Sequence, residues 1–243
     1  MDRSRAEHQM PVHNKFLAIE GIDGAGKRTQ IDLLCRLLRK RGVAFSRFSF
    51  PRYSSFYGRM VGRFLNGDFG RLPHVDAHFS ALLYAGDRLE AKSDLEHALE
   101  SGRVVVADRY AASNLAHQSA RVPARWREAF LKWLLELEYK VHRIPREELI
   151  VLLRVPAAQA QRLVERKATR DYTRKKKDIQ EADLKHLEEA AKIYDRLARG
   201  PRWLTIECFD AAARKLRPPD EIHRELVQRI EARAGFLLRR KRR

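Results

Sequence analysis

The stretch GIDGAGKRTQ, residues 21–30, restricts the fold of this chain more than any other part of its sequence. It fits the phosphate-binding pattern in which two glycines with four residues between them precede a lysine, here Gly21, Gly26 and Lys27. Such glycines let backbone N–H groups curl around phosphate oxygens, and the helix that follows adds positive charge. The hydroxyl residue that normally follows the lysine is replaced by Arg28, and Thr29 comes one place later. The alternative is a glycine-rich turn without a ligand.

The elements on either side of this stretch favour the phosphate loop. KFLAIEG (15–21) is a short apolar run that predicts a buried strand ending at the loop. From Thr29 onward, apolar residues recur on one helical face, and VAFSRFSF (43–50) then alternates like a strand. A strand, a loop, a helix and a second strand in this order form a βαβ unit, the setting in which phosphate loops occur.

The rest of the chain continues the alternation of helices and strands. Helices are expected over 75–90, 92–100, 122–138 and 220–231, and buried strands over 103–108, 148–155 and 203–208. The apolar stripe in 122–138 (Trp126, Phe130, Trp133, Leu134, Leu137) is interpreted as core, with a subunit interface as the alternative. The pattern predicts an α/β fold with a central parallel sheet flanked by helices, which binds ligands beyond the carboxyl ends of the strands.

Composition narrows the possible partners. The formal net charge of +18 favours polyanions such as nucleotides, nucleic acid or anionic lipid, without choosing among them. No apolar run approaches the ~20 residues needed to span a bilayer, and the polar residues 1–14 lack a signal-peptide core, so a cytoplasmic protein is expected. Cys35 and Cys208 offer neither a disulfide framework nor metal-ligand spacing, and we expect both to be small core residues.

Two further motifs suit a nucleotide acceptor. In YAGDR (84–88), Tyr84 and Arg88 share a helix face, where a ring and a guanidinium can contact a planar base; the alternative is a packed tyrosine beside a surface arginine. In DRYAASNLAHQ (108–118), Arg109 follows a strand and suits bidentate capture of a phosphate. Asn114 and Gln118 share the next helix face and offer amides to a base edge.

Taken together, these stretches resemble the thymidylate kinase family of P-loop nucleoside monophosphate kinases. The resemblance covers roughly residues 15–230, in the order of the family, and is carried by EGIDGAGKRTQ (20–30), FPRY (50–53), YAGDR (84–88), DRYAASNLAHQ (108–118) and IYDRLA (193–198). It implies a P-loop kinase fold with a mobile basic lid over about 164–180. It also implies transfer of the γ-phosphoryl of ATP to dTMP, giving dTDP, with Mg²⁺ as cofactor and a homodimer as the assembly.

The resemblance implies a role for each site residue. The donor ATP would be held by Gly21, Gly24, Ala25, Gly26, Lys27, Arg28 and Thr29. The acceptor would be bound by Asp23, Arg52, Tyr53, Tyr84, Arg88, Arg109, Asn114, His117 and Gln118. Among these, Arg52 and Arg109 would clamp its phosphate, Tyr84 would stack on thymine, and Arg88 and Asn114 would read the base edge. Asp23 and Glu181 would assist the metal.

The segment 164–180 is dense in arginine and lysine. A solvated basic helix face is the ordinary interpretation of such a run, but it falls where the resembling kinases carry a lid with a catalytic arginine. The phosphate loop has Gly24 and Ala25 where other members place a basic residue, so the lid would supply that charge, worth roughly 10³–10⁵ in rate. The sequence does not rank the three candidates, Arg166, Arg170 and Arg174.

Three residues depart from the family pattern. Arg28 occupies the place of the metal-binding hydroxyl, so Mg²⁺ would depend on phosphates, water and acidic side chains. His117 stands where an aromatic residue usually lies beside the sugar, which keeps a kinase for another nucleoside monophosphate open as an alternative. Arg154 stands where many members have an acid.

A nucleotide-regulated nucleic-acid-binding protein is the alternative from another class. It would leave the acceptor motifs without a purpose, so nucleic acid is not the expected partner, and no membrane partner is expected either. The domain organisation that follows is a polar extension (1–14), a kinase-like domain (15–232) and a basic tail (233–243).

Overall fold

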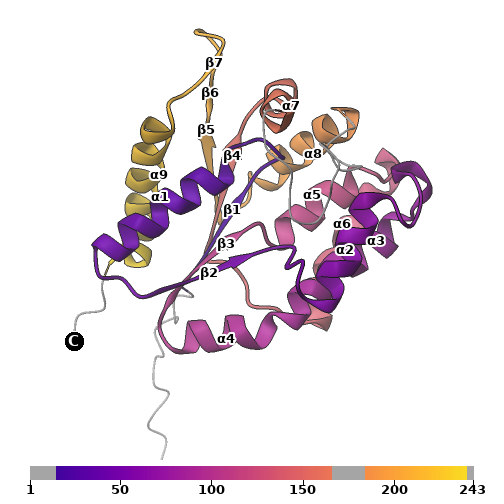
Figure 1. Ribbon diagram of the computed structural model, residues 1–243, viewed down its shortest axis with the longest axis horizontal. Helices are drawn as coiled ribbons and strands as arrows, with labels where there is room; N and C mark the ends of the chain where they lie inside the picture. Colours follow the sequence, from indigo (N-terminus) through magenta and orange to yellow (C-terminus); the bar gives the residue numbers. More distant parts are fainter. Residues whose placement is uncertain (1–14, 166–183, 240–243) are drawn as a thin grey trace, which may run out of the picture.

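A five-stranded parallel sheet forms the centre of the computed structural model, which describes residues 15–165 and 184–239 (Figure 1). Its strands are β1 (Phe16–Glu20), β2 (Phe45–Ser49), β3 (Val104–Asp108), β4 (Leu149–Arg154) and β5 (Trp203–Glu207). They lie in the order β2-β3-β1-β4-β5. The predicted α/β fold with a central parallel sheet is confirmed.

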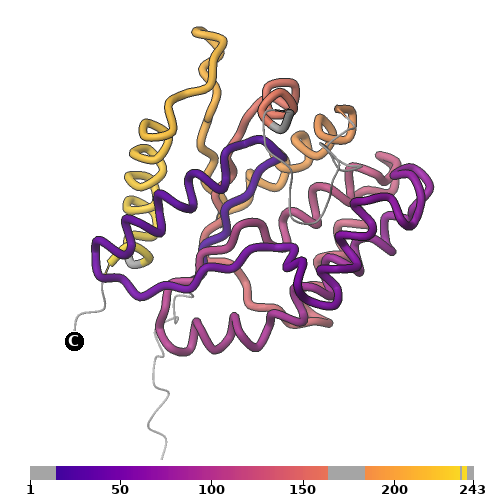
Figure 2. The backbone as a smooth tube through the Cα atoms, in the orientation of Figure 1, coloured from indigo at the N-terminus to yellow at the C-terminus, as the bar shows by residue number. Residues whose placement is uncertain are grey.

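Helices cover both faces of the sheet. They are α1 (Lys27–Lys40), α2 (Phe56–Asn66), α3 (Ala77–Glu90), α4 (Lys92–Glu100), α5 (Ala111–Ser119), α6 (Arg127–Glu136), α7 (Ala157–Glu165), α8 (Leu184–Leu197) and α9 (Pro219–Ala234). Short 3₁₀ turns occur at Leu72–His74, Ala124–Trp126 and Gly235–Leu238, a π-helical turn at Leu137–Val141, and a small hairpin at β6 (Phe209–Asp210) and β7 (Lys215–Leu216). Figure 2 shows α1 in indigo and α9 in yellow running side by side, although they come from opposite ends of the chain.

The strands bury side chains on both faces, which explains their unbroken apolar sequences. In β1, Leu17 and Ile19 belong to the cluster that includes the apolar faces of α1 and α9. Phe16 and Ala18 point to the other face and pack in a cluster with side chains of α4. None of the helices in the described parts of the chain is both long enough and apolar enough to span a bilayer.

The order of the strands places the loop after β1 in a crevice at the edge of the sheet. β1 pairs with β3 on one side and β4 on the other, with Ile19 opposite Asp108 and Glu20 opposite Leu152. Because the strands are parallel, the loops after β1 and β3 leave the sheet at the same edge. The connections diverge on either side of β1, and ligands of open α/β sheets bind at such a switch point.

Several predicted boundaries were wrong. Helix α3 begins at Ala77 rather than at residue 75, because the Asp76 side chain accepts hydrogen bonds from the N–H groups of His78 and Phe79 and caps the helix. Trp126 was predicted to lie in the core but is 59% exposed. It lies in the 3₁₀ turn before α6, outside the helical register from which its burial was inferred.

The last helix extends beyond the predicted range of 220–231. Helix α9 continues to Ala234, and Leu237 and Leu238 are buried in the cluster formed with α1 and the sheet. The folded part of the chain therefore extends through the 3₁₀ turn. Cys35 and Cys208 are buried and free, as expected for small core residues.

Candidate active site

The loop that follows β1 adopts a conformation that glycine permits. Gly24 and Gly26 have φ of 89° and 83°, in the left-handed region that other residues rarely enter. An ideal Cβ on Gly24 would lie 2.1 Å from the carbonyl oxygen of Ala160 in α7, so the loop and that helix are in close contact. Helix α1 starts directly after Gly26, and the side chains of Arg28 and Thr29 are exposed in its first turn.

Lys27 folds back over this loop. Its ammonium group donates hydrogen bonds to the carbonyl oxygens of Gly21 and Ile22, at 2.9 and 3.0 Å. The side chain is buried, and its charge lies at the rim where loop amides and the start of α1 also concentrate positive potential. This is the charge distribution of an anion site.

Arg109, directly after β3, meets the same loop from the other side. Its Nη1 donates to the Gly21 carbonyl at 3.1 Å and to Ser113 Oγ at 2.9 Å, and its Nη2 donates to Asp23 Oδ1 at 2.7 Å. The Gly21 carbonyl therefore accepts from both Lys27 and Arg109. Two cations from different strand ends converge on one oxygen, which gives two adjoining positions for phosphate groups.

Glu20 fixes the segment that carries Arg109. This fully buried carboxylate accepts hydrogen bonds from the N–H groups of Tyr110 and Ser113, at 2.7 and 3.2 Å, and so caps the start of α5. It also accepts from Ser113 Oγ and the Tyr194 hydroxyl. Burial raises the pKa of Glu20, against the opposing effect of these donors and of Arg109. The sequence motif contains Glu20, but our reading of the motif gave it no role.

A pair of histidines lies beside Arg109. His117 Nε2 is 3.4 Å from Arg109 Nη1, and its Nδ1 is 3.3 Å from Nε2 of His186 in α8. Burial, followed by the positive charges of Arg109 and His186, lowers the pKa of His117 well below its usual value. The imidazole is therefore neutral near pH 7 and can accept a hydrogen bond from the arginine.

Arg88 and Asn114 converge on an acid that the sequence analysis missed. Arg88 is 2% exposed, so the alternative of a surface arginine is excluded, and it forms a buried ion pair with Glu138 in the π-helical turn. Asn114 Nδ2 donates to the Ala81 carbonyl and to Glu138 Oε1, each at 3.0 Å. Tyr84, one turn before Arg88, makes an edge contact with Phe64 in α2. Nothing in the apolar stripe around Glu138 singled it out.

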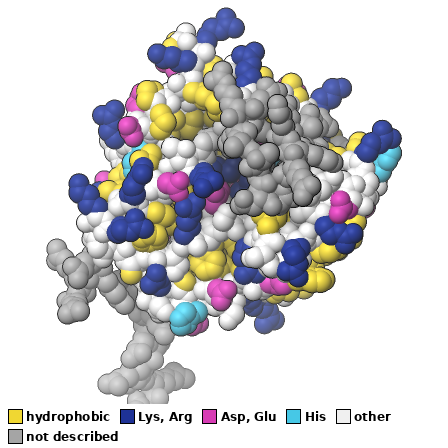
Figure 3. All heavy atoms as spheres, viewed as in Figure 1, with side chains coloured by type: hydrophobic (Ala, Val, Ile, Leu, Met, Phe, Trp, Pro, Cys, Tyr) yellow, Lys and Arg dark blue, Asp and Glu magenta, His cyan; other side chains and the backbone are white. Residues whose placement is uncertain are grey.

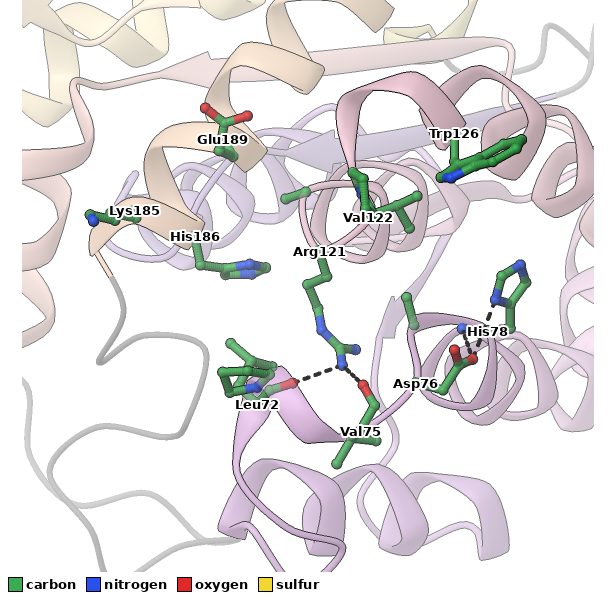
Figure 4. Close-up of a pocket in the computed structure, with 14 residues that line it drawn as sticks. Leu72, Val75, Asp76, His78, Arg121, Val122, Trp126, Lys185, His186 and Glu189 are labelled. Carbon is green, nitrogen blue, oxygen red and sulfur yellow. Dashed lines mark hydrogen bonds and ion pairs between the residues drawn. The ribbon is translucent and has the colours of Figure 1, made fainter.

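Gln118 ties α5 to α3. Its Oε1 accepts hydrogen bonds from Ser80 Oγ and Arg121 Nη1, both at 2.8 Å. Beyond it lies a cavity of about 520 Å³ between the start of α3, the end of α5 and the start of α8 (Figure 4). Figure 4 shows Arg121 extended toward the carbonyls of Leu72 and Val75, which both accept from its Nη2.

The FPRY segment is attached to α3 by a second acid that we had not identified. Asp87, 1% exposed, accepts from the Arg52 N–H at 2.8 Å, from Arg52 Nε at 3.3 Å and from Ser55 Oγ at 2.7 Å. Tyr53 packs against the apolar cluster between α2 and α3. The Asp87 carboxylate thus sets the position of Arg52, which is only partly exposed.

The structure accounts for the positive charge of Arg154, which the sequence alone did not explain. At the end of β4 it pairs with Asp195 Oδ1 and Glu207 Oε1, each at 2.8 Å. Both acids lie on neighbouring elements, α8 and β5, so the positive charge is locally matched. The predicted lid residues Arg166, Arg170 and Arg174 and the predicted metal ligand Glu181 lie outside the described residues.

Mg²⁺ fits the acidic group at the loop. Within residues 15–165 and 184–239, no three His, Cys, Asp or Glu side chains gather as a metal cage. Mg²⁺ often needs only one or two carboxylates, with water and substrate phosphates completing its shell. Asp23 is partly exposed beside the two cations and suits that arrangement.

A parallel sheet with a phosphate loop after its central strand, and a second cation brought to that loop by the neighbouring strand, defines a P-loop nucleoside monophosphate kinase. The family model for thymidylate kinase matches residues 19–214. The chain belongs to the thymidylate kinase family.

Curated relatives agree with this assignment, and a solved structure agrees with the fold. Thymidylate kinase from Mycobacterium tuberculosis is 32% identical over 212 residues, covering 84% of this chain and 98% of that protein. A probable thymidylate kinase from Pyrobaculum calidifontis is 33% identical, covering 93% of this chain and all of that protein. The structure of thymidylate kinase from Candida albicans matches with a TM-score of 0.72 at 18% identity, covering 93% of this chain and 94% of that one.

Proposed function

We propose that this chain transfers the γ-phosphoryl group of ATP to dTMP, giving dTDP. The observation that carries the proposal is that the Gly21 carbonyl oxygen accepts hydrogen bonds from both Lys27 and Arg109. Donor and acceptor phosphates bound by these two cations would meet end to end. Phosphoryl transfer depends mainly on such positioning and on charge neutralisation, so no strong general base is required.

The proposal gives each site residue a role. The loop from Gly21 to Thr29, with Lys27, holds the donor phosphates. Arg109 and Arg52 hold the acceptor phosphate, and Tyr53 lies beside it. Tyr84, Arg88 and Asn114 bind the base, with His117 and Gln118 on the same helix as Asn114. Asp23 would help to hold Mg²⁺, whose charge would offset that of the donor phosphates.

We infer further that the chain acts as a homodimer through α2 and α3. Large exposed apolar side chains gather on these two adjoining helices: Phe56, Tyr57, Phe79, Leu82 and Leu89. Phe79, Leu82 and Leu89 lie on one face of α3. Contiguous apolar surface of this kind marks interaction sites. The lid function of 164–180 and the cytoplasmic location stay sequence predictions.

The direct test is a coupled assay of ADP release with dTMP, dUMP, UMP and dGMP as acceptors. We expect dTMP to give the highest kcat/KM. Lys27→Met is expected to lower turnover by about 10²–10³-fold, because it removes a preplaced charge at the developing negative charge. Arg199→Ala, a change at an arginine after α8, serves as the control.

Three results would contradict the proposal. ADP release that does not respond to dTMP would exclude this acceptor, and a stronger response to another monophosphate would favour a kinase of different specificity. Little transfer together with polynucleotide binding that weakens steeply with salt would favour the nucleic-acid alternative. On the face shown in Figure 3, basic side chains are scattered among acidic, hydrophobic and uncharged ones.

A further inference from the structure

Glu138 connects two residues of the proposed base site. It lies in the π-helical turn after α6 and has no exposed surface. One oxygen accepts from Arg88 Nε at 3.1 Å, and the other accepts from both Arg88 Nη2 and Asn114 Nδ2. A single acid from a distant element therefore holds an arginine of α3 and an asparagine of α5.

These bonds determine which way the Asn114 amide faces. An amide nitrogen has two hydrogens to donate, and Ala81 and Glu138 accept both from Nδ2. Glu138, paired with a permanently charged guanidinium, has only acceptors to offer, so the amide oxygen cannot face it. Asn114 Oδ1 is left buried and without a hydrogen-bond partner in the described parts of the chain.

An orphaned acceptor in this position points to a ligand donor. A buried acceptor without a partner is unfavourable, and such groups are normally satisfied by water or a bound molecule. Arg88 is held at Nε and Nη2, while its Nη1 makes no hydrogen bond among residues 15–165 and 184–239. The pair thus offers one acceptor, Asn114 Oδ1, and one donor, Arg88 Nη1.

We propose that Glu138 is a positioning residue that sets the hydrogen-bond polarity of base recognition, so that the site selects a pyrimidine with an N3–H donor and a 4-carbonyl acceptor over cytosine. Thymine and uracil carry this pair of groups, whereas cytosine has an acceptor at N3 and an amino group at C4. The inference rests on the proposed function, because it takes Arg88 and Asn114 to border the acceptor base.

The substitution Glu138→Gln tests this hydrogen-bond polarity, because it hardly changes the shape of the side chain. The glutamine replaces one acceptor by a donor, so three donors that now share two carboxylate oxygens must compete for one. Turning the Asn114 amide over would let Oδ1 accept from the new amide, but it would also set Oδ1 against the carbonyl oxygen of Ala81. Whether the amide reverses or Arg88 and Asn114 shift, the site no longer offers a fixed acceptor to the N3–H group, which disfavours thymine.

The matched control is Glu147→Gln. Glu147 is also a buried carboxylate, 3% exposed, but its partner is the Tyr139 hydroxyl at 2.8 Å. The change therefore alters a buried acid in the same region of the fold without touching Arg88 or Asn114. Both variants and the unmodified chain are compared for kcat and KM with dTMP and dCMP, for dTMP affinity by calorimetry and for Tm.

We expect Glu138→Gln to raise the KM and Kd for dTMP by about tenfold to a hundredfold, with a smaller change in kcat. The ratio of kcat/KM for dTMP over dCMP should fall at least tenfold, while Glu147→Gln leaves it unchanged. A folded Glu138→Gln protein with unchanged KM and unchanged dTMP preference would overturn the inference. Failure of the unmodified chain to use dTMP would instead overturn the proposed function.

Glu138→Gln also leaves a buried guanidinium without its counter-charge and can fail to fold. In that case, Arg88→Met combined with Glu138→Met removes both charges and leaves the Asn114 amide bonded to Ala81 alone. Full retention of the dTMP preference in this variant overturns the inference. The unmodified chain gives one more check, since N3-methyl-dTMP should bind at least tenfold more weakly than dTMP, and equal binding contradicts an acceptor facing N3.

Discussion

Arg109 shows how one residue can be held in a demanding conformation. Its φ of 64° lies in the left-handed region, which costs a residue with a side chain roughly 1–3 kcal/mol. Glu20 offsets this cost by binding the N–H group of Tyr110, which directly follows Arg109, and that of Ser113, four residues beyond Arg109. The guanidinium is then fixed by Asp23, Gly21 and Ser113. The result is a charge that is already in place before any phosphate binds, which lowers the reorganisation that catalysis requires.

The buried carboxyl group of Glu147 also gives a prediction at the scale of a single residue. Burial raises its pKa from 4.5 to about 7. As the pH rises from 4.5 to 7, the unfolded chain releases this proton while the folded chain keeps it, so the folded state loses stability across that window and the loss levels off above it. Glu147→Gln removes this dependence. We expect the free energy of unfolding of the unmodified chain, relative to the variant, to fall by roughly 3 kcal/mol between pH 4.5 and 7.5.

Urea unfolding of both proteins at several pH values measures this difference. The two stability curves should diverge through the window and run parallel above pH 7.5. Parallel curves throughout would mean that the carboxyl group titrates in the folded protein as it does in the unfolded one.

At the scale of elements, the phosphate loop depends on the helix packed against it. Gly24 lies against the backbone of α7, whereas an ideal Cβ on Gly26 would have no neighbour within 4 Å. Both glycines have positive φ, so both alanine variants carry the cost of a left-handed residue. Only a side chain at Gly24 would force the loop and α7 apart.

The two alanine variants form a matched pair. We expect Gly24→Ala to lower the free energy of unfolding by at least about 2 kcal/mol more than Gly26→Ala does, because overpacking adds to the backbone cost. Urea unfolding without nucleotide measures both. Equal losses of stability in the two variants would show that the loop and α7 can move apart without an energetic cost.

On the scale of the whole molecule, the apolar face of α2 and α3 is the surface that we propose forms the dimer interface. Stable interfaces bury about 1,200–2,000 Å² and are richer in aromatic and apolar side chains at their centre. Leu82, 44% exposed on α3, lies in the middle of the exposed side chains on that helix. A charge placed there would be buried unpaired in a dimer.

Leu82→Asp is therefore expected to shift the chain from dimer to monomer in sedimentation velocity experiments. The control is Lys40→Glu on α1, an exposed position on the helical layer that packs with α9. That change also adds negative charge but leaves α2 and α3 intact. A monomeric unmodified chain, or a Leu82→Asp protein that remains dimeric, would exclude this face as the interface.

Local sequence determined most of the framework of this protein. The strands around the phosphate loop were predictable because parallel strands covered on both faces need unbroken apolar runs, and the loop because glycine and lysine at fixed spacing have a specific physical use. The residues with obvious charge, such as Lys27 and Arg109, were recognisable for the same reason. Element ends were less accurate, as at Asp76 and Trp126, because caps and turns depend on single side-chain contacts.

Tertiary structure alone decided which acids hold the site together. Glu20, Asp87 and Glu138 each bind groups from another element, at sequence separations of 90, 35 and 50 residues. A buried carboxylate is stable only when its partners surround it, and those partners come together only when the chain folds. The sequence contains the acids and their partners, but no spacing along the chain signals that they meet.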